Sequence, residues 1–76
     1  MEINTFIEQI KSQFIDAEEI TLLSATEFRT ISSWDSLTGM AILVMIKDEY
    51  NVEMSDDDLK FCKTVQEIYN FVEKSL

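Results

Sequence analysis

The sequence Trp34-Asp35-Ser36-Leu37 stands just before the most apolar run of the chain, Met40 to Ile46. This order predicts a helix that begins at Ser36, because Asp35 can act as its N-cap and accept a hydrogen bond from a backbone N–H of the first turn. A hydroxyl group at this position lies at the positive end of the helix macrodipole, where unpaired N–H groups favour a phosphate. Taken alone, the motif also fits an ordinary helix start, so the rest of the chain has to decide between the two interpretations.

Length and cysteine content limit the kinds of site that the chain can hold. Its 76 residues suffice for one domain with a small core, which we expect to span residues 1–76. The chain has one cysteine, Cys62, and no histidine, which excludes an internal disulfide and a zinc site of Cys and His ligands. The usual general bases and nucleophile pairs are missing as well. We therefore expect no metal site and no enzyme, and we expect Cys62 to be a small, partly buried hydrophobic residue.

The charge balance points to protein partners. The 15 acidic and 6 basic residues give a net charge of −9, so nucleic acids and anionic membrane surfaces would be repelled, whereas basic protein surfaces would be attracted. No apolar stretch approaches the ~18 residues of a membrane span, and the N-terminus lacks a signal-peptide pattern. The sequence therefore predicts a cytoplasmic protein with no membrane span.

The first half of the chain reads as one amphipathic helix followed by a long loop. Apolar residues recur at helical spacing and predict a helix that ends near Ile15 or Asp16, with the buried stripe Ile3, Phe6, Ile7, Ile10 and Phe14. The next 20 residues, 16–35, follow neither a helical nor a strand period. We expect them to form a loop, with room for a short helical turn, that is pinned to the core by Leu22, Leu23, Phe28 and Ile31.

The central helix is predicted to run from Ser36 to Tyr50 and is apolar on nearly every side. Its most probable core face consists of Ile42, Leu43, Ile46 and Tyr50. Because a domain of this size can hardly bury a helix completely, we prefer to assign the other apolar residues to a docking face of Leu37, Met40, Ala41 and Val44. Gly39 weakens a helix; a close approach by another group at the helix entrance would explain it, and a tolerated accident would explain it equally well.

Two capped helices are predicted in the last third. Ser55 can cap a short helix, with Leu59 and either Phe61 or Cys62 facing inward. The six acids around it could suggest a calcium loop, but the spacing lacks the glycine and the terminal Glu of an EF-hand. Thr64 and Glu67 then form a capping box that opens a helix with the stripe Val65, Ile68, Tyr69, Val72 and Leu76. The predicted fold class is all-α, a small four-helix bundle of three main helices and a short third helix, with the long loop between the first two helices.

Across its whole length the chain resembles the acyl carrier protein family. The family's Asp-Ser-Leu motif at the start of the second helix is present as Asp35, Ser36 and Leu37. The aromatic Phe28 eight residues before the serine, the short acidic third helix and the final helix opened by Thr64 fit the same pattern. A three-residue motif recurs by chance, but the same motif at this helix entrance, in a chain of this length and charge, is far more specific.

The resemblance implies the following roles. Ser36 would carry 4′-phosphopantetheine, Asp35 would cap the helix and help to present the serine, and Leu37 would complete the motif. A phosphopantetheinyl transferase would attach the arm, adenylating or acyl-transferring enzymes would load it, and acyl-processing enzymes would act on the thioester. We expect a monomer. Acids on the second and third helices, here Asp48, Asp56 and Asp57, would meet basic patches on these enzymes.

Departures from the family's pattern suggest a specialised member. Thr38, Ala41 and Lys47 stand where many fatty-acid carriers have acids, and Trp34 replaces a small residue. Our hypothesis is a free-standing carrier of a dedicated pathway whose partners dock on apolar residues near the serine. The alternatives are a housekeeping fatty-acid carrier, an aminoacyl or peptidyl carrier, and an acidic helical interaction module without a cofactor.

The resemblance also raises the possibility of a cavity between the helices that shelters the acyl chain. Its lining would comprise Phe61, Ile46, Ile42 and Tyr50, which are equally good core residues.

Overall fold

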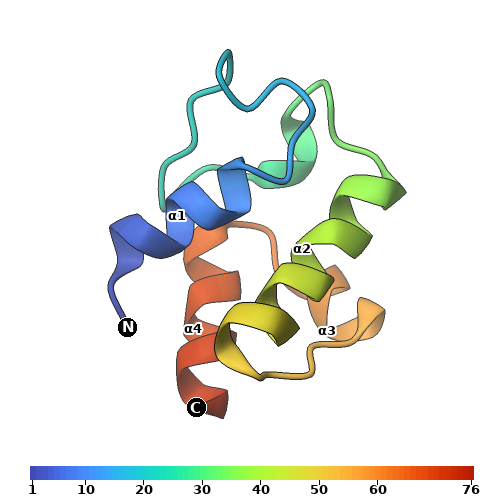
Figure 1. The fold of residues 1–76 in the computed structure, drawn as a ribbon. Coiled ribbons are helices and arrows are strands. Elements are labelled where there is room, and N and C mark those ends of the chain that lie inside the picture. The colour runs from blue at the N-terminus through green and yellow to red at the C-terminus, as the bar shows by residue number, and fades with distance from the viewer.

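The computed structural model describes residues 1–76 and consists of helices joined by turns and loops (Figure 1). Its elements, in chain order, are α1 (Ile3–Lys11), the 3-10 turn η1 (Phe28–Thr30), α2 (Ser36–Tyr50), α3 (Asp56–Lys60) and α4 (Val65–Ser75). The predicted all-α class, with three longer helices and a short third one, is confirmed. None of these helices has both the length and the apolar character that crossing a membrane would require.

The core forms where the apolar stripes of α1, α2 and α4 meet, and α1 contacts both of the other two helices. Ile42 and Ile46 of α2 are fully buried, as predicted for core residues, and Leu43 and Tyr50 are partly buried beside them. Met45, which the sequence did not assign to the core face, is buried as well. The buried set is Phe6, Ile7, Ile10, Phe14, Leu22, Phe28, Ile42, Met45, Ile46, Val52, Met54, Leu59, Cys62, Val65, Ile68, Tyr69 and Val72.

The first helix is shorter than predicted: it ends at Lys11 and not near Ile15 or Asp16. The N–H groups of Gln13 and Phe14 donate to carbonyls three residues earlier, at 3.1 and 3.0 Å, so the chain tightens after Lys11. This turn directs Phe14 into the core and leaves Ile15 in solvent. The apolar stripe was therefore right, but the helix does not continue to the end of the stripe.

Three apolar residues that the sequence analysis placed in or near the core lie at the surface, although for the short helix it left Phe61 and Cys62 as alternatives and Cys62 does face inward. Leu23, Phe61 and Leu76 are 61%, 86% and 65% exposed. Next to Leu23, Leu22 is buried in its place, and next to Phe61, Cys62 is buried in its place. The prediction that Phe61 could line a cavity for an acyl chain is therefore wrong.

The long loop is tied to the body of the molecule at several points. The backbone N–H groups of Val65 and Gln66, at the start of α4, donate to the carbonyls of Thr26 and Ser24 at 3.2 and 2.8 Å. Further along, the Ser33 hydroxyl donates to the Asp16 carboxylate at 2.6 Å, which joins the two ends of the loop. As Figure 1 shows, the loop crosses the end of the molecule at which α2 begins. These contacts fix the position from which the chain enters α2.

The capping box that was predicted for the last helix is present. Thr64 accepts a hydrogen bond from the Glu67 N–H, and the Glu67 carboxylate accepts from the N–H groups of Lys63 and Thr64 at 2.6 and 3.0 Å. These backbone donors stabilise the charged form of the carboxyl group and lower the pKa of Glu67 below its ordinary value. The start of α4 therefore depends on an ionised side chain.

Replacing Glu67 by glutamine gives a pH-dependent effect. Glutamine keeps the shape of the capping box but not the charge. Because the pKa of Glu67 is lower in the folded chain than in the unfolded one, its charge stabilises the fold above the ordinary value of 4.5, and this contribution is lost as the pH falls through the lowered pKa. Urea denaturation from pH 7 to pH 3 should show wild type losing its advantage over Glu67→Gln at the acid end. A difference that stays constant over this range would contradict the prediction. Glu18→Gln, which removes a charge from the loop, is the control.

Candidate functional site

Ser36 is the first residue of α2, and its side chain is exposed. Asp35 precedes it as the N-cap: one carboxylate oxygen accepts from the Thr38 N–H at 2.8 Å and from the Thr38 hydroxyl at 3.0 Å. The Gly39 N–H donates to the Asp35 carbonyl at 3.1 Å and closes the first helical turn. The predicted helix start and its cap are thus confirmed, and the Ser36 hydroxyl makes no hydrogen bond within the chain.

The cap keeps Asp35 ionised. The backbone N–H of Thr38, and then its hydroxyl, lower the pKa of the Asp35 carboxyl below its usual value. Both groups donate to the charged carboxylate, so protonating it would weaken the first turn. Asp35 therefore holds the helix entrance in place directly beside the exposed serine.

Trp34 packs closely against the same entrance. Its ring lies 5.1 Å from the Phe28 ring and 6.1 Å from the Phe14 ring, measured between centroids. A Cβ atom on Gly39 would lie 3.3 Å from two carbons of the indole, which is tighter than an ordinary contact. Of the two explanations for this glycine, the close approach is therefore the right one, and the approaching group is a tryptophan of the same chain.

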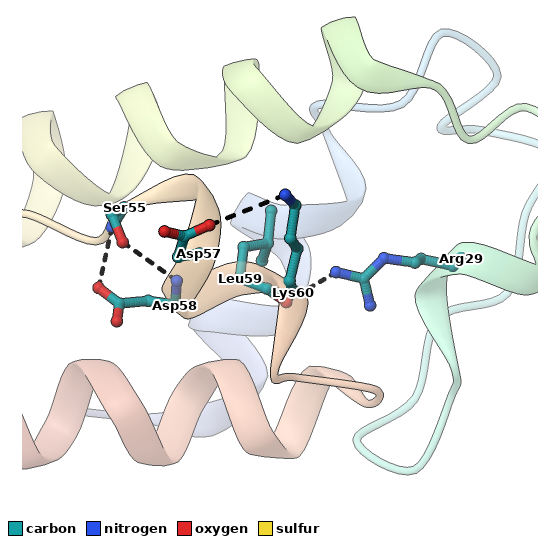
Figure 2. Close-up of polar contacts among 6 residues, drawn as sticks. All are labelled: Arg29, Ser55, Asp57, Asp58, Leu59 and Lys60. Carbon is teal, nitrogen blue, oxygen red and sulfur yellow. Dashed lines mark hydrogen bonds and ion pairs between the residues drawn. The ribbon is translucent and has the colours of Figure 1, made fainter.

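Arg29, which the sequence analysis did not single out, joins the loop to α3. Its guanidinium group donates to the carbonyls of Leu59 and Cys62 at 2.7 and 2.6 Å, and it lies 4.7 Å above the Phe28 ring. Figure 2 shows Arg29 approaching the end of α3 from the loop. Two hydrogen bonds from one planar group fix the position of α3 relative to the loop. The only sign of this role in the local sequence is that Arg29 directly follows the buried Phe28.

The short helix α3 also has its own cap. The Ser55 hydroxyl and the Asp58 carboxylate bind each other's backbone N–H groups at 3.1 and 3.0 Å, which completes a capping box (Figure 2). On the same helix, the Lys60 ammonium lies 3.7 Å from the Asp57 carboxylate, and both side chains are largely exposed. An exposed pair of this kind contributes little to stability, so Lys60 can be drawn to another anion.

A cleft of about 320 Å³ borders Ser36 between the start of α2 and α3. Two of the predicted partner-binding residues, Met40 and Asp56, lie in its wall, together with Arg29, Trp34, Gly39, Leu59 and Lys60. Three others, Ala41, Val44 and Asp48, line a second hollow further along α2. Five of the six predicted partner-binding residues thus line one of two hollows, and Asp57 of α3 lines neither.

The predicted docking face is accessible. Leu37, Met40 and Val44 are 73%, 58% and 58% exposed, and Ala41 is partly buried. The acids Asp48, Asp56 and Asp57 are exposed as well. Cys62 is buried, and burial raises the pKa of its thiol, so it resembles a core residue and not a nucleophile.

The residues around Ser36 fit a covalently attached phosphate group. An exposed hydroxyl at a capped helix start offers a phosphodiester the positive end of a helix macrodipole, and the adjacent cleft leaves space for a chain beyond the phosphate. No group of three or more His, Cys, Asp or Glu side chains is arranged to hold a metal ion. The fold and the site together define a small acidic helical domain that presents a serine at a helix entrance.

Comparison with known proteins agrees with this class. A family model described as phosphopantetheine attachment site matches residues 15–72. An acyl carrier protein of Phytoplasma australiense is 32% identical over 75 residues, covering 92% of this chain and 96% of that protein. "Acyl carrier protein 3" of Ralstonia nicotianae is 29% identical, covering 95% and 86%. An acyl carrier protein of Thermobifida fusca is 45% identical over 40 residues, about half of each chain. No solved structure shows a significant match.

The chain belongs to the acyl carrier protein family. The family match spans most of its length, and the relative from Phytoplasma australiense aligns nearly end to end. Membership identifies 4′-phosphopantetheine as the prosthetic group. It also implies that a modifying transferase and enzymes of synthesis interact with the chain.

Proposed function

We propose that Ser36 receives the 4′-phosphopantetheine arm and that residues 1–76 act as a single, monomeric carrier domain. The chain is then the substrate of a transferase and not a catalyst. The Ser36 oxygen attacks the β-phosphate of coenzyme A within that enzyme, so a serine–phosphate bond forms and the bond to the α-phosphate breaks. Adenosine 3′,5′-bisphosphate leaves, and the hydroxyl proton passes to a base of the transferase. When bound, the arm supplies a terminal thiol that holds an acyl group as a thioester.

The observation that carries this proposal is the position of Ser36. Its side chain is exposed, it makes no hydrogen bond within the chain, and it lies on the first residue of a helix whose cap is provided by Asp35. A transferase can therefore reach the hydroxyl without disturbing the fold. The negative charge of the product lies near the helix N-terminus, where it is favourable.

The test is the intact mass of the wild-type chain after incubation with coenzyme A and a broad-specificity phosphopantetheinyl transferase. The proposal predicts a gain of one phosphopantetheine group and no more. The alternative of another class, an acidic helical interaction module without a cofactor, predicts no gain. Absence of any gain with several such transferases would contradict the proposal.

We further propose that this carrier serves a dedicated pathway and that its partners dock on apolar side chains. Leu37, Met40 and Val44 are exposed apolar residues at helical spacing i, i+3 and i+7, which places them on one side of α2 as it leads away from the serine. Lys47 lies where many fatty-acid carriers have an acid, and its ammonium lies 3.2 Å from the Glu53 carboxylate. The exposed acids Asp48, Asp56 and Asp57 would add a steering field that speeds encounter with basic enzyme surfaces.

Replacing Leu37 by alanine should slow attachment of the arm without unfolding the chain. Leu37 is 73% exposed and contributes little to the core, but it lies next to the reacting serine. A docking residue worth ~1–2 kcal/mol would lower the apparent second-order rate constant of the transferase about five- to thirtyfold. Leu23, which is 61% exposed on the long loop, gives a matched control. Equal rates for Leu37→Ala and Leu23→Ala would contradict the docking face.

Loading by a generic malonyl transferase distinguishes a dedicated carrier from a housekeeping one. The modified chain should be loaded much more slowly than a fatty-acid carrier at the same concentration, because the acids that such enzymes meet are replaced by Thr38, Ala41 and Lys47. Loading at a comparable rate would argue for the housekeeping alternative. Efficient loading by an amino-acid-activating enzyme would favour an aminoacyl carrier.

A further inference from the structure

We propose that the groove between α1 and the loop segment 22–25 is a second docking surface, which takes a basic amphipathic helix of a partner protein. The groove has a volume of about 530 Å³, against about 320 Å³ for the cleft beside Ser36. Its lining includes Ile3, Ile7 and Glu8 of α1 and Leu22, Leu23 and Ala25 of the loop. It shares no residue with the cleft at Ser36 or with the hollow further along α2. The proposal therefore does not depend on attachment at Ser36.

Apolar side chains form the floor of the groove and part of its wall. Ile7 and Leu22 are buried and form the floor, whereas Leu23 is largely exposed. The backbone of Leu23 is nevertheless held in place: its N–H donates to the Thr26 hydroxyl at 2.9 Å, and its carbonyl accepts from the Thr26 N–H at 3.1 Å. The carbonyls of Ser24 and Thr26 are bound in turn by the start of α4. A partner thus meets a preformed apolar surface, and binding orders little of this chain.

Charge indicates that the partner is basic. Glu8 is the one charged residue in the lining of the groove. Residues 1–27, which supply both walls, carry six acids against Lys11 and the N-terminal amino group. These acids are Glu2, Glu8, Asp16, Glu18, Glu19 and Glu27. Along the adjoining α4, Lys63 and Lys74 offset Glu67 and Glu73. The groove therefore lies in a negative part of the surface, which attracts a basic segment and repels an acidic one, including a second copy of this chain.

The geometry of α1 favours a helix as the occupant. Ile3 and Ile7 lie one turn apart on α1, about 6 Å along its axis. Two apolar side chains one turn apart on a partner helix match this spacing. A lysine or arginine on the next turn of the partner then meets the Glu8 carboxylate. Recognition of a helix in a groove depends on such apolar anchors, so we expect the partner segment to carry leucine-type anchors beside lysine or arginine.

The position of the groove suggests what such a partner would do. In Figure 1 the loop segment 22–25 runs beside α1, on the opposite side of the molecule from the start of α2. A partner bound there leaves Ser36 and the exposed side chains of Leu37, Met40 and Val44 free. One protein can then hold the carrier while a second enzyme acts at the serine. Holding the carrier in this way raises the effective concentration of its serine for enzymes on the same assembly.

The test uses the full chain and a synthetic peptide of about 15 residues, because shorter helices are marginal in water. The peptide carries leucine at every third or fourth position and lysine elsewhere. Backbone amide resonances of the isotope-labelled, unmodified chain report where it binds. The proposal predicts shifts centred on α1 and residues 22–25, and much weaker binding of a peptide with glutamate in place of lysine. No binding, or shifts centred on α2 and α3, would overturn the proposal. The same groove shifts on concentrating the chain without peptide would assign the groove to a second copy and overturn it as well.

Replacing Leu23 by alanine separates docking in the groove from general attraction to an acidic chain. Leu23→Ala should weaken binding of the peptide about five- to thirtyfold, the effect of losing an interface anchor. Ile15→Ala is the matched control, because Ile15 is also an exposed apolar residue near the end of α1 but does not line the groove. Because the groove lies away from Ser36, Leu23→Ala should still receive the arm at the wild-type rate. Equal peptide affinities of the two variants would overturn the groove as the binding site.

A second pair of variants tests the charge. Glu8→Gln should weaken binding of the peptide about two- to fivefold, the range of an exposed ion pair. Glu18→Gln removes the same charge from outside the lining and should have a smaller effect. Equal effects of the two substitutions would overturn the contact with Glu8.

Discussion

Replacing Ser36 by alanine is expected to abolish attachment of phosphopantetheine and to leave the fold unchanged. In the proposed reaction the Ser36 hydroxyl oxygen forms the new bond to phosphorus, and alanine has no substitute for it. The side chain makes no hydrogen bond within the chain, and alanine is a good helix former. The cap also remains, because Asp35 binds the backbone and hydroxyl of Thr38 and not Ser36. Attachment of the arm should therefore fail because the reacting hydroxyl group is missing, and not because the chain has unfolded.

Intact mass after treatment with coenzyme A and the transferase measures attachment of the arm. Thermal unfolding shows whether the fold is unchanged. Ser32→Ala is the matched control, because Ser32 is also exposed and lies only four residues earlier, in the loop that leads into α2. It should gain one arm like wild type. A modified Ser36→Ala chain would contradict the assignment of the attachment residue. Circular dichroism of the Ser36→Ala chain shows whether it is folded. If it is folded and gains no arm, the loss is due to the missing hydroxyl group.

Replacing Phe28 by alanine is expected to cost a large share of the chain's stability. Phe28 is fully buried although it lies in the long loop, and its ring contacts Trp34 at 5.1 Å between centroids. Removing a buried phenylalanine side chain typically costs ~3–5 kcal/mol, whereas a fold of 76 residues has roughly 4–11 kcal/mol in total. The variant also loses the surface on which Arg29 lies. We expect the variant to unfold at a much lower urea concentration than the wild type.

Urea denaturation followed by Trp34 fluorescence and by helix content measures this effect. Phe61→Ala is the matched control, because Phe61 is 86% exposed and its removal should change the midpoint little. If both phenylalanine variants kept the wild-type midpoint, Phe28 would not anchor the loop as described. A loss of similar size in Phe61→Ala would contradict the exposure of that residue.

Features set by neighbouring residues were predictable from the sequence. Both bounds of α2 agree with prediction, because Asp35 caps its start locally and Asn51 ends it in a left-handed conformation that asparagine tolerates. The Thr64–Glu67 capping box is local in the same way. The end of α1 was missed because the apolar stripe continues through a tight turn beyond Lys11.

Features that depend on contacts between distant segments were not predictable. Whether Phe61 or Cys62 faces inward depends on how α3 packs, and the two residues are adjacent in sequence. Gly39 suggested a close approach at the helix entrance without identifying the group, and a tolerated accident explained it equally well. The role of Arg29 depends on carbonyl groups 30 and 33 residues away. The helix entrance at Ser36, the proposed attachment residue, was therefore within reach of sequence analysis, whereas the cleft beside it was not.

The most direct test of the central claim is to locate the arm on the modified wild-type chain by peptide fragmentation mass spectrometry. Several serines lie close together, among them Ser32 and Ser33, so a gain in intact mass alone does not identify the residue. We predict that the phosphopantetheine mass is found on Ser36 and on no other residue. An arm on any other serine, or a chain that transferases leave unmodified, would contradict the account.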